Sequence, residues 1–224
     1  MPNPRELLER FAGIARLFPL PNLALFPGIE QGLHIFEPRY RQMMAEALDG
    51  DGLIAMVLLK PDWEPNYDGA PEIERTACLG RISAWERLPD GRYNLRLEGL
   101  ARFRIEAEVR QPEQLFRSAR GVLAFDIGPE ELSDAIDYRR RLGDTLLAKF
   151  AGNPAAVSWL SNLISSDDDL GTVCDRLAYA LPLPLLLKQQ LLDNNLSLSR
   201  ARMLLDTIST KDERGRFPPK FSYN

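Results

Sequence analysis

The sequence predicts an α+β protein, with a β-barrel-like N-terminal domain followed by a C-terminal helical bundle. Between residues 17 and 127, apolar side chains alternate with polar ones or form short unbroken runs, which is typical of β-strands. From Gly128 onward they recur every three to four positions, which indicates helices. We expect an N-terminal helix over 1–16, the barrel over 17–127, the bundle over 128–210 and a loosely ordered tail over 211–224.

The chain begins with a helix-start pattern. Asn3 precedes a proline, and Glu6 follows in what would be the first turn, as in capped helices. An apolar stripe at helical spacing follows, made of Leu7, Leu8, Phe11, Ile14 and Ala15. This segment lacks the basic region and apolar stretch of a secretory signal, so we expect none.

The segment from Leu17 to Tyr40 is rich in conformationally restricted residues. It reads LFPLPNLALFPGIEQGLHIFEPRY and contains the only histidine of the chain. We expect a buried strand interrupted at Pro27-Gly28, and then a helix that starts at Glu37-Pro38. One face of that helix would be buried, with the side chains of Tyr40, Met43, Met44, Ala47 and Leu48.

The remaining strands follow from apolar runs and turns. Leu53–Leu59 is continuously apolar and predicts a strand covered on both faces. Leu79–Leu88 and Arg92–Leu100 flank an Asp-Gly pair, which is a strong hairpin signal. Ala119–Phe125 makes a last strand, so the region holds enough strands to close a small barrel.

Five helices are expected in the C-terminal part. Their predicted ranges are Glu130–Phe150, Pro154–Ile164, Asp167–Leu181, Pro184–Asn194 and Ser199–Ile208.

A family resemblance is carried by five segments of the chain. Two of them, LPNLALFPG and LHIFEPRY, lie in its first third. The later segments are CLGRI at Cys78–Ile82, LPDGRYNLRLEGLARFRI at Leu88–Ile105 and LPLPLLLKQQLL at Leu181–Leu192. In this order they resemble the Lon N-terminal domain, also called the LON substrate-binding domain, and most of all its stand-alone bacterial members. The resemblance implies a PUA-like pseudo-barrel that binds polypeptide substrates, without the ATPase and peptidase domains of Lon protease.

Motifs for catalysis and for metal binding are missing from the sequence. There is no GxxxxGK[ST] phosphate-binding loop, and no serine stands in a context that resembles the Ser-Lys motif of the Lon peptidase. The only thiol and imidazole groups belong to Cys78, Cys174 and His34, too few for a zinc site of usual composition. The acidic run Asp167–Asp169 lacks calcium-loop spacing and suits a helix N-terminus. We expect no catalytic residue, cofactor or metal.

Most motif residues are expected to be structural. His34 lies in an apolar run, so a hydrogen-bonded structural histidine is favoured over a catalytic one. Either Glu37 and Arg39 form a polar recognition pair, or Glu37 accepts backbone N–H groups while Arg39 ties the helix to a neighbouring strand; we favour the second alternative. The full set of family-motif residues in this group is Pro27, Gly28, His34, Phe36, Glu37, Pro38, Arg39, Tyr40, Gly91 and Gly99.

The loop Lys60–Glu72 is the candidate docking surface. Its aromatic residues Trp63 and Tyr67, set among prolines, either dock an extended peptide or hold the loop against the barrel. A basic stripe of Arg81, Arg92, Arg96, Arg102 and Arg104 is also expected on the exposed strand faces, neutralised by Glu86, Glu98, Glu106 and Glu108.

The leading functional hypothesis is a non-catalytic binding module. It would recognise unfolded or extended polypeptide through an apolar groove between barrel and helices, with a protease or chaperone as a further partner. RNA or nucleotide recognition by the PUA-like barrel is the alternative, and a Lon-type peptidase activity is the third.

A net charge of −4 and a pI of about 5.2 disfavour binding of nucleic acid. No membrane span is expected, because no apolar run reaches about 18 residues, and two widely spaced cysteines suggest a cytoplasmic protein.

Overall fold

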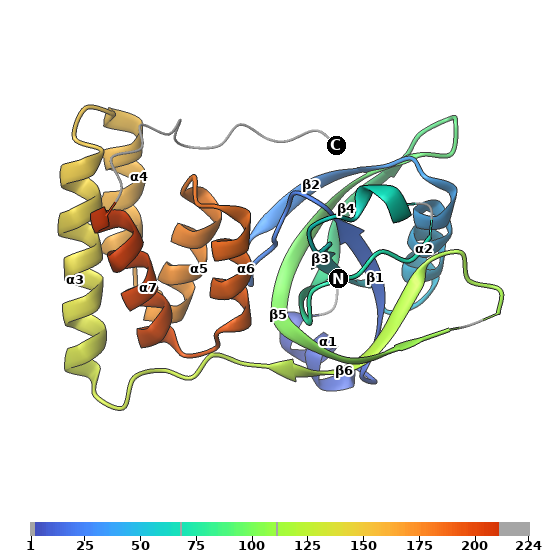
Figure 1. Ribbon diagram of the computed structural model, residues 1–224, viewed down its shortest axis with the longest axis horizontal. Coiled ribbons are helices and arrows are strands. Elements are labelled where there is room, and N and C mark those ends of the chain that lie inside the picture. The colour runs from blue at the N-terminus through green and yellow to red at the C-terminus, as the bar shows by residue number, and fades with distance from the viewer. Residues whose placement is uncertain (1–2, 68, 111, 211–224) are drawn as a thin grey trace. The chain divides into compact units, whose positions relative to one another are not determined.

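The computed structural model describes residues 3–67, 69–110 and 112–210, and the chain divides into two compact units between Ala124 and Phe125. The first unit is β-rich and the second is helical (Figure 1). This arrangement confirms the predicted α+β class. The predicted tail over 211–224 lies outside the described residues.

The first unit contains a closed ring of five strands. β1 pairs in parallel with β3 and antiparallel with β6, and the pairs β3–β4, β4–β5 and β5–β6 complete the ring. β2 pairs with β5 and lies outside this ring. The strands are β1 (Ile14–Leu20), β2 (Glu30–Ile35), β3 (Leu53–Leu58), β4 (Thr76–Arg87), β5 (Tyr93–Val109) and β6 (Arg117–Ala124).

β3 is buried along its whole length, as its unbroken apolar run predicts. Its alternate residues enter two apolar clusters. Leu53, Ala55 and Val57 belong to one, and Ile54 and Met56 to the other. The strand is therefore covered on both faces.

The β4–β5 hairpin forms at the predicted Asp-Gly turn. Gly91 has φ +83°, a left-handed conformation that favours glycine, and its N–H donates to the Leu88 carbonyl at 2.9 Å. The Leu88 N–H in turn donates to the Arg92 carbonyl at 2.8 Å. This turn sets the register of the two longest strands.

Gly99 lets the chain before β2 approach β5 closely. A Cβ at this position would overlap the Phe26 carbonyl oxygen and lie 2.8 Å from Cys78 Sγ. The Gly99 N–H donates to the Ile29 carbonyl at 2.9 Å, and the Gly28 N–H donates to the Gly99 carbonyl at 2.8 Å. Two glycines of the family motif, Gly28 and Gly99, thus join the loop before β2 to β5.

The described part of the first unit also contains two α-helices and a short 3-10 helix, η1 (Glu64–Asn66). α1 (Pro4–Arg10) starts as predicted, with the Asn3 side chain accepting the Arg5 N–H at 3.1 Å. It ends earlier than predicted, because Ile14 and Ala15 belong to β1. α2 (Pro38–Asp49) buries Tyr40, Met43, Met44 and Ala47, four of the five side chains predicted for its inner face, while Leu48 is only partly buried.

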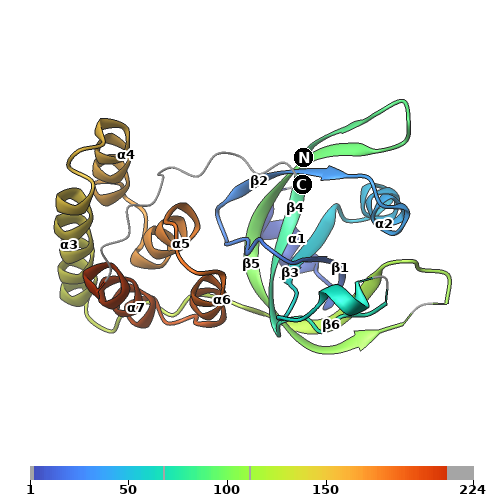
Figure 2. The same cartoon turned by 45° about the horizontal axis from the view of Figure 1, so that its top comes forward.

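The second unit is a five-helix bundle, as predicted. Its helices are α3 (Leu132–Lys149), α4 (Pro154–Ile164), α5 (Leu170–Ala180), α6 (Leu185–Asp193) and α7 (Ser197–Thr210). α3 packs beside α7 and α4, and α7 also packs beside α5 (Figure 2). The Asp169 side chain caps α5 by accepting the Thr172 N–H at 2.8 Å. None of the described helices is long and apolar enough to cross a membrane.

A buried arginine ties the segment before α3 to this bundle. Arg200 of α7 is 0% exposed and forms ion pairs with Asp126 and Asp175. Ile127 also bridges to Leu196, so the segment after β6 is anchored by side chains and backbone together.

Candidate functional site

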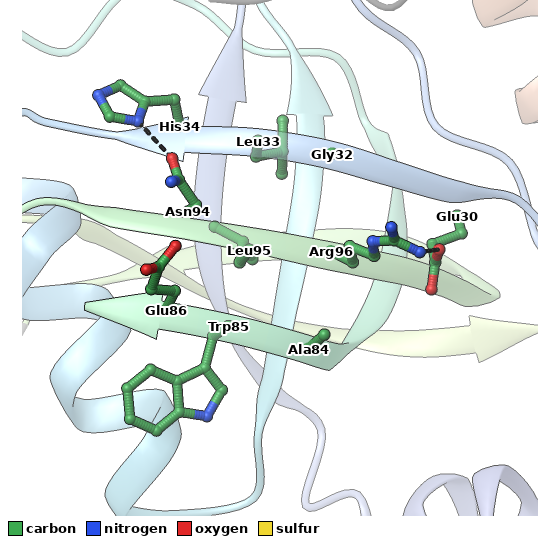
Figure 3. A pocket seen from close by; sticks show the side chains of 10 residues that line it. All are labelled: Glu30, Gly32, Leu33, His34, Ala84, Trp85, Glu86, Asn94, Leu95 and Arg96. Carbon is green, nitrogen blue, oxygen red and sulfur yellow. Dashed lines mark hydrogen bonds and ion pairs between the residues drawn. The ribbon is translucent and has the colours of Figure 1, made fainter. Parts of the chain in front are cut away.

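Three neighbouring strand segments form a concave surface in the first unit, which we call the three-strand floor. It consists of β2, residues 93–98 of β5 and residues 84–87 of β4. His34, Asn94 and Glu86 form one row across these strands, and Gly32, Arg96 and Ala84 form the next. The floor opens onto a cavity of about 640 Å³ lined by Glu30, Gly32, Leu33, His34, Ala84, Trp85, Glu86, Asn94, Leu95 and Arg96 (Figure 3).

His34 is held by hydrogen bonds at both ring nitrogens. Its Nδ1 lies 2.7 Å from Asn94 Oδ1, and its Nε2 lies 3.3 Å from an Arg92 guanidinium nitrogen. A guanidinium only donates, so Nε2 accepts and Nδ1 donates, which is the arrangement of a neutral imidazole. This geometry suits the predicted structural role near the end of a strand.

The acidic and basic groups that line the cavity are paired within the described chain, with one exception. Arg96 lies 3.1 Å from Glu30, whose other carboxylate oxygen accepts from the Ser83 hydroxyl at 2.7 Å. The Glu86 side chain is exposed, and its carboxylate makes no hydrogen bond or ion pair with another residue of the described chain. The Glu86 carboxylate is therefore available to bind a group of a ligand.

Two aromatic side chains border the floor. Trp85 is 51% exposed, and its ring lies 6.3 Å from that of Tyr93. Phe36 is 52% exposed and stacks on His34 at 6.2 Å. The sequence interpretation missed Trp85, although a tryptophan between polar neighbours near a hairpin end is a usable signal of an exposed aromatic residue.

A second, smaller cavity of about 190 Å³ adjoins the first. It lies among the ends of β1 and β2 and the start of α2, and it shares Leu33 and His34 with the cavity above the floor. Tyr67 from the aromatic loop also lines it.

The aromatic loop is attached to the start of α2 by Tyr67. The Tyr67 hydroxyl donates to Glu37 at 2.7 Å, and Arg39 lies 4.9 Å from the Tyr67 ring centroid. Burial and the hydrogen bond to Glu37 raise the pKa of Tyr67 above its ordinary value. Trp63 packs edge-on against Tyr67 at 5.4 Å. These contacts fit the alternative in which the loop is held against the barrel, and docking by Trp63 and Tyr67 stays a prediction.

Glu37 corrects one expectation. It is the residue before α2, but its side chain accepts no backbone N–H there. Instead it accepts from Arg39 Nε at 2.9 Å as well as from Tyr67. Arg39 also donates to the Tyr67 carbonyl at 3.3 Å, so it ties the helix to the loop and not to a strand.

Six of the ten family-motif residues lie at two places, and the other four lie in three further segments. Glu37, Pro38, Arg39 and Tyr40 form the start of α2, and burial raises the pKa of Tyr40. His34 and Phe36 lie at the rim of the floor. The four remaining residues, Pro27, Gly28, Gly91 and Gly99, lie in the loop before β2, in the hairpin turn and in β5.

Carboxylates neutralise part of the expected basic stripe, as predicted for Glu98. Arg81 pairs with Glu98 at 2.7 Å and Arg92 pairs with Asp90 at 2.6 Å. Arg102 is only 2% exposed, which corrects its expected position on the wet face. The β4–β5 pairing shifts register beside Leu79 and Gly80, and this irregularity breaks the alternation on which the expectation rested.

Groups that could hold a metal ion do not cluster within the described residues. Cys78 and Cys174 are both buried, one in β4 and one in α5, and no disulfide joins them.

Comparison with known proteins identifies relatives along most of the chain. Lon protease 1 of Bdellovibrio bacteriovorus is 26% identical over 211 residues, covering 91% of this chain and 25% of the relative. Lon protease of Anaeromyxobacter dehalogenans is 23% identical over 209 residues, covering 92% of this chain and 24% of the relative. The chain thus spans about a quarter of the length of these curated relatives.

Solved structures agree on the fold. The Lon N-terminal domain protein from Xanthomonas campestris superposes with a TM-score of 0.62 at 24% identity, covering 86% of this chain and 97% of the other. The N-terminal domain of Mycobacterium avium complex Lon protease gives a TM-score of 0.68 at 16% identity, covering 88% and 98%. The family model of the ATP-dependent protease La (LON) substrate-binding domain matches residues 14–210. The chain therefore belongs to the LON substrate-binding domain family.

Proposed function

We propose that this chain is a non-catalytic binding module that holds unfolded or extended polypeptide, and that the three-strand floor is its binding surface. The observation that carries the proposal is the combination, in one place, of an open cavity, two exposed aromatic side chains and exposed strand segments. Membership of a substrate-binding domain family supports the same conclusion.

The chemistry of the floor suits a polypeptide. An unfolded segment offers backbone N–H and C=O groups that can pair with a strand, and apolar side chains that can pack on aromatic rings. Exposed tryptophan and phenylalanine supply large contact areas at a small loss of conformational entropy. The carboxylates of Glu30, Glu86 and Glu98 outnumber the guanidinium groups of Arg87 and Arg96 in the floor, which makes it a poor surface for nucleic acid, since that requires net positive charge.

The proposal includes no bond-breaking step by this chain. His34 uses both ring nitrogens in hydrogen bonds, and a serine-lysine peptidase motif does not occur in the sequence. A protease or chaperone that receives the bound polypeptide is the partner we propose, since the matched relatives are Lon proteases. The apolar groove between barrel and helices stays a prediction.

We also propose that the chain works in the cytoplasm. Both cysteines are buried thiols that form no disulfide with each other, and a reducing compartment preserves thiols.

The direct test uses a polypeptide that cannot fold, such as a reduced and carboxymethylated protein carrying a fluorescent label. Its anisotropy should rise saturably with the concentration of this chain, and the same protein in its native fold should compete poorly. Unlabelled RNA should not displace it. Absence of any saturable rise would refute polypeptide binding, displacement by RNA would favour the nucleic-acid alternative, and cleavage of the polypeptide would refute the non-catalytic assignment.

A further inference from the structure

We infer that the bound polypeptide adds a β-strand to the free edge of β4, and that it carries a lysine or arginine next to an apolar residue. The cationic side chain faces Glu86 and the apolar side chain packs on Trp85. We call residues Ala84–Arg87 the β4 edge. This inference rests on the proposed function and names the class of polypeptide that the floor selects.

The β4 edge is open on one side. Pairing of β4 with β3 ends at Arg81, opposite Leu53, whereas pairing with β5 continues to Arg87, opposite Tyr93. Within the described chain, β5 is thus the only strand beside the β4 edge, and all four side chains of this edge are exposed. An exposed edge presents backbone donors and acceptors to an incoming extended segment.

The unpaired carboxylate of Glu86 favours a cationic side chain in the bound polypeptide. Arg96 is already paired with Glu30, and Arg92 with Asp90. Glu86 alone among the charged groups lining the cavity has no partner. A cation from the ligand would supply the missing charge, whereas a carboxylate or phosphate would meet an unbalanced negative group.

Trp85 favours an apolar residue next to that cation in the bound polypeptide. Successive side chains of a strand point to opposite faces, so Trp85 and Glu86 face opposite sides of the sheet. Figure 3 shows the Trp85 indole projecting beyond the β4 ribbon on the side away from β5, and the Glu86 carboxylate on the side of Asn94. Side chains directly opposite in paired strands have Cβ atoms about 5 Å apart. Adjacent residues of an added strand therefore meet Glu86 and Trp85 in turn.

A purely protective role is the competing explanation for Glu86. Proteins place charges on exposed edge strands to prevent pairing with other chains. That explanation predicts that removing the charge promotes self-association, and that bound peptides show no preference for a cation.

The probes are short synthetic peptides of alternating threonine and valine with one central pair, Lys-Phe, Gln-Phe or Glu-Phe, each with a fluorescent label. The full chain should bind the Lys-Phe peptide best, and Glu86→Gln should weaken that binding roughly two- to fivefold, the range of a cross-strand ion pair. Added salt should reduce this difference. Methylating alternate backbone nitrogens of the Lys-Phe peptide should abolish binding, because strand addition needs those donors.

Two variants make the result specific. Glu106→Gln removes an exposed carboxylate of β5 outside the floor, and it should leave peptide affinity unchanged. Glu86→Lys should reverse the preference, so that the Glu-Phe peptide binds better than the Lys-Phe peptide. Because Glu86 is exposed and unpaired, these variants should keep the wild-type thermal unfolding curve.

The outcomes separate this inference from the proposed function. Equal binding of the three peptides with no effect of Glu86→Gln overturns the cation preference and leaves polypeptide binding intact. Self-association of Glu86→Gln without a change in peptide affinity supports the protective role and also overturns the inference. Binding of the unfolded polypeptide but of no short peptide overturns the β4 edge as the site, and failure of both probes refutes the proposed function itself.

Discussion

Gly99 shows how one residue links the family motif to stability. Its missing side chain allows the Phe26 carbonyl and Cys78 Sγ to approach, so Gly99→Ala overpacks a junction that cannot easily open. We expect it to lower the free energy of unfolding by about 1–3 kcal/mol in urea denaturation. Gly32→Ala is the matched control, since a Cβ there meets nothing within 4 Å. Equal effects of the two substitutions would contradict the role of close approach.

Lys188 makes stability depend on pH. Burial lowers its pKa to about 8, whereas a lysine in an unfolded chain titrates at about 10.4. Between these two pKa values the unfolded state binds more protons than the folded state, so the contribution of Lys188 to stability rises with pH. Below about pH 8 the free-energy cost of burying its charged ammonium group is fully present.

The variant Lys188→Met has no such titration. It should therefore be more stable than the wild type near pH 7, and its advantage should shrink as the pH rises toward about 9.5. Chemical denaturation of both proteins at several pH values measures the difference. A difference that is constant over this range would show that Lys188 is not the group responsible.

At the residue scale, the sequence predicts where a residue lies in a turn or helix better than it predicts which residues its side chain contacts. The turn glycine Gly91 and the helix start at Pro38 are found where the pattern places them. The partner of Glu37 could not be predicted, because Tyr67 lies 30 positions away and reaches it only through the path of the loop. The exposure of Trp85 likewise depends on where the pairing of β3 with β4 ends.

At the scale of elements, Arg139 joins α3 to the end of α4 and to the segment that leads into α5. From α3 it donates to the carbonyls of Ile164, Asp168 and Leu163, at 2.7, 2.6 and 3.1 Å. These carbonyls lie at the end of α4 and before the start of α5, where the backbone lacks helical partners. A planar guanidinium can serve several acceptors at once, which an ammonium on a flexible stem cannot do equally well.

Arg139→Lys should therefore cost about 2 kcal/mol of unfolding free energy, because the Ile164 and Asp168 carbonyls lose a donor. The adjacent Arg140→Lys is the control: Arg140 is exposed, and its ion pairs with Asp137 and Asp144 lie within its own helix, so this substitution should change the free energy of unfolding much less. Thermal or urea unfolding of the pair gives the comparison. A loss at position 139 no larger than that at position 140 would show that the carbonyl contacts add little.

The elements themselves were largely predictable. Five helical ranges agree within a few residues, because apolar spacing and caps such as Asn153 and Asp169 are local signals. The end of α1 was not predictable in this way. Ile14 and Ala15 continue its apolar stripe, yet they pair with β6, a strand more than 100 positions away along the chain.

At the scale of the whole molecule, the chain combines a closed barrel with an unclosed extension. The ring of five strands removes most sheet edges, while β2 and the end of β4 extend beyond it and keep one edge each. Family membership and the class of fold follow from the motifs, but the floor does not, because it depends on which strand segments lack a neighbour. That property belongs to the assembled sheet and to no single motif.

The most direct test of the central claim is an NMR titration of the full isotope-labelled chain with an unfolded polypeptide. We predict saturable shifts at backbone amides of the three-strand floor, including His34, Trp85, Glu86 and Asn94, and no shifts at Val122 on β6. Saturable shifts confined to Trp63 and Tyr67 would place binding on the aromatic loop instead. No shifts at high polypeptide concentration would contradict the account.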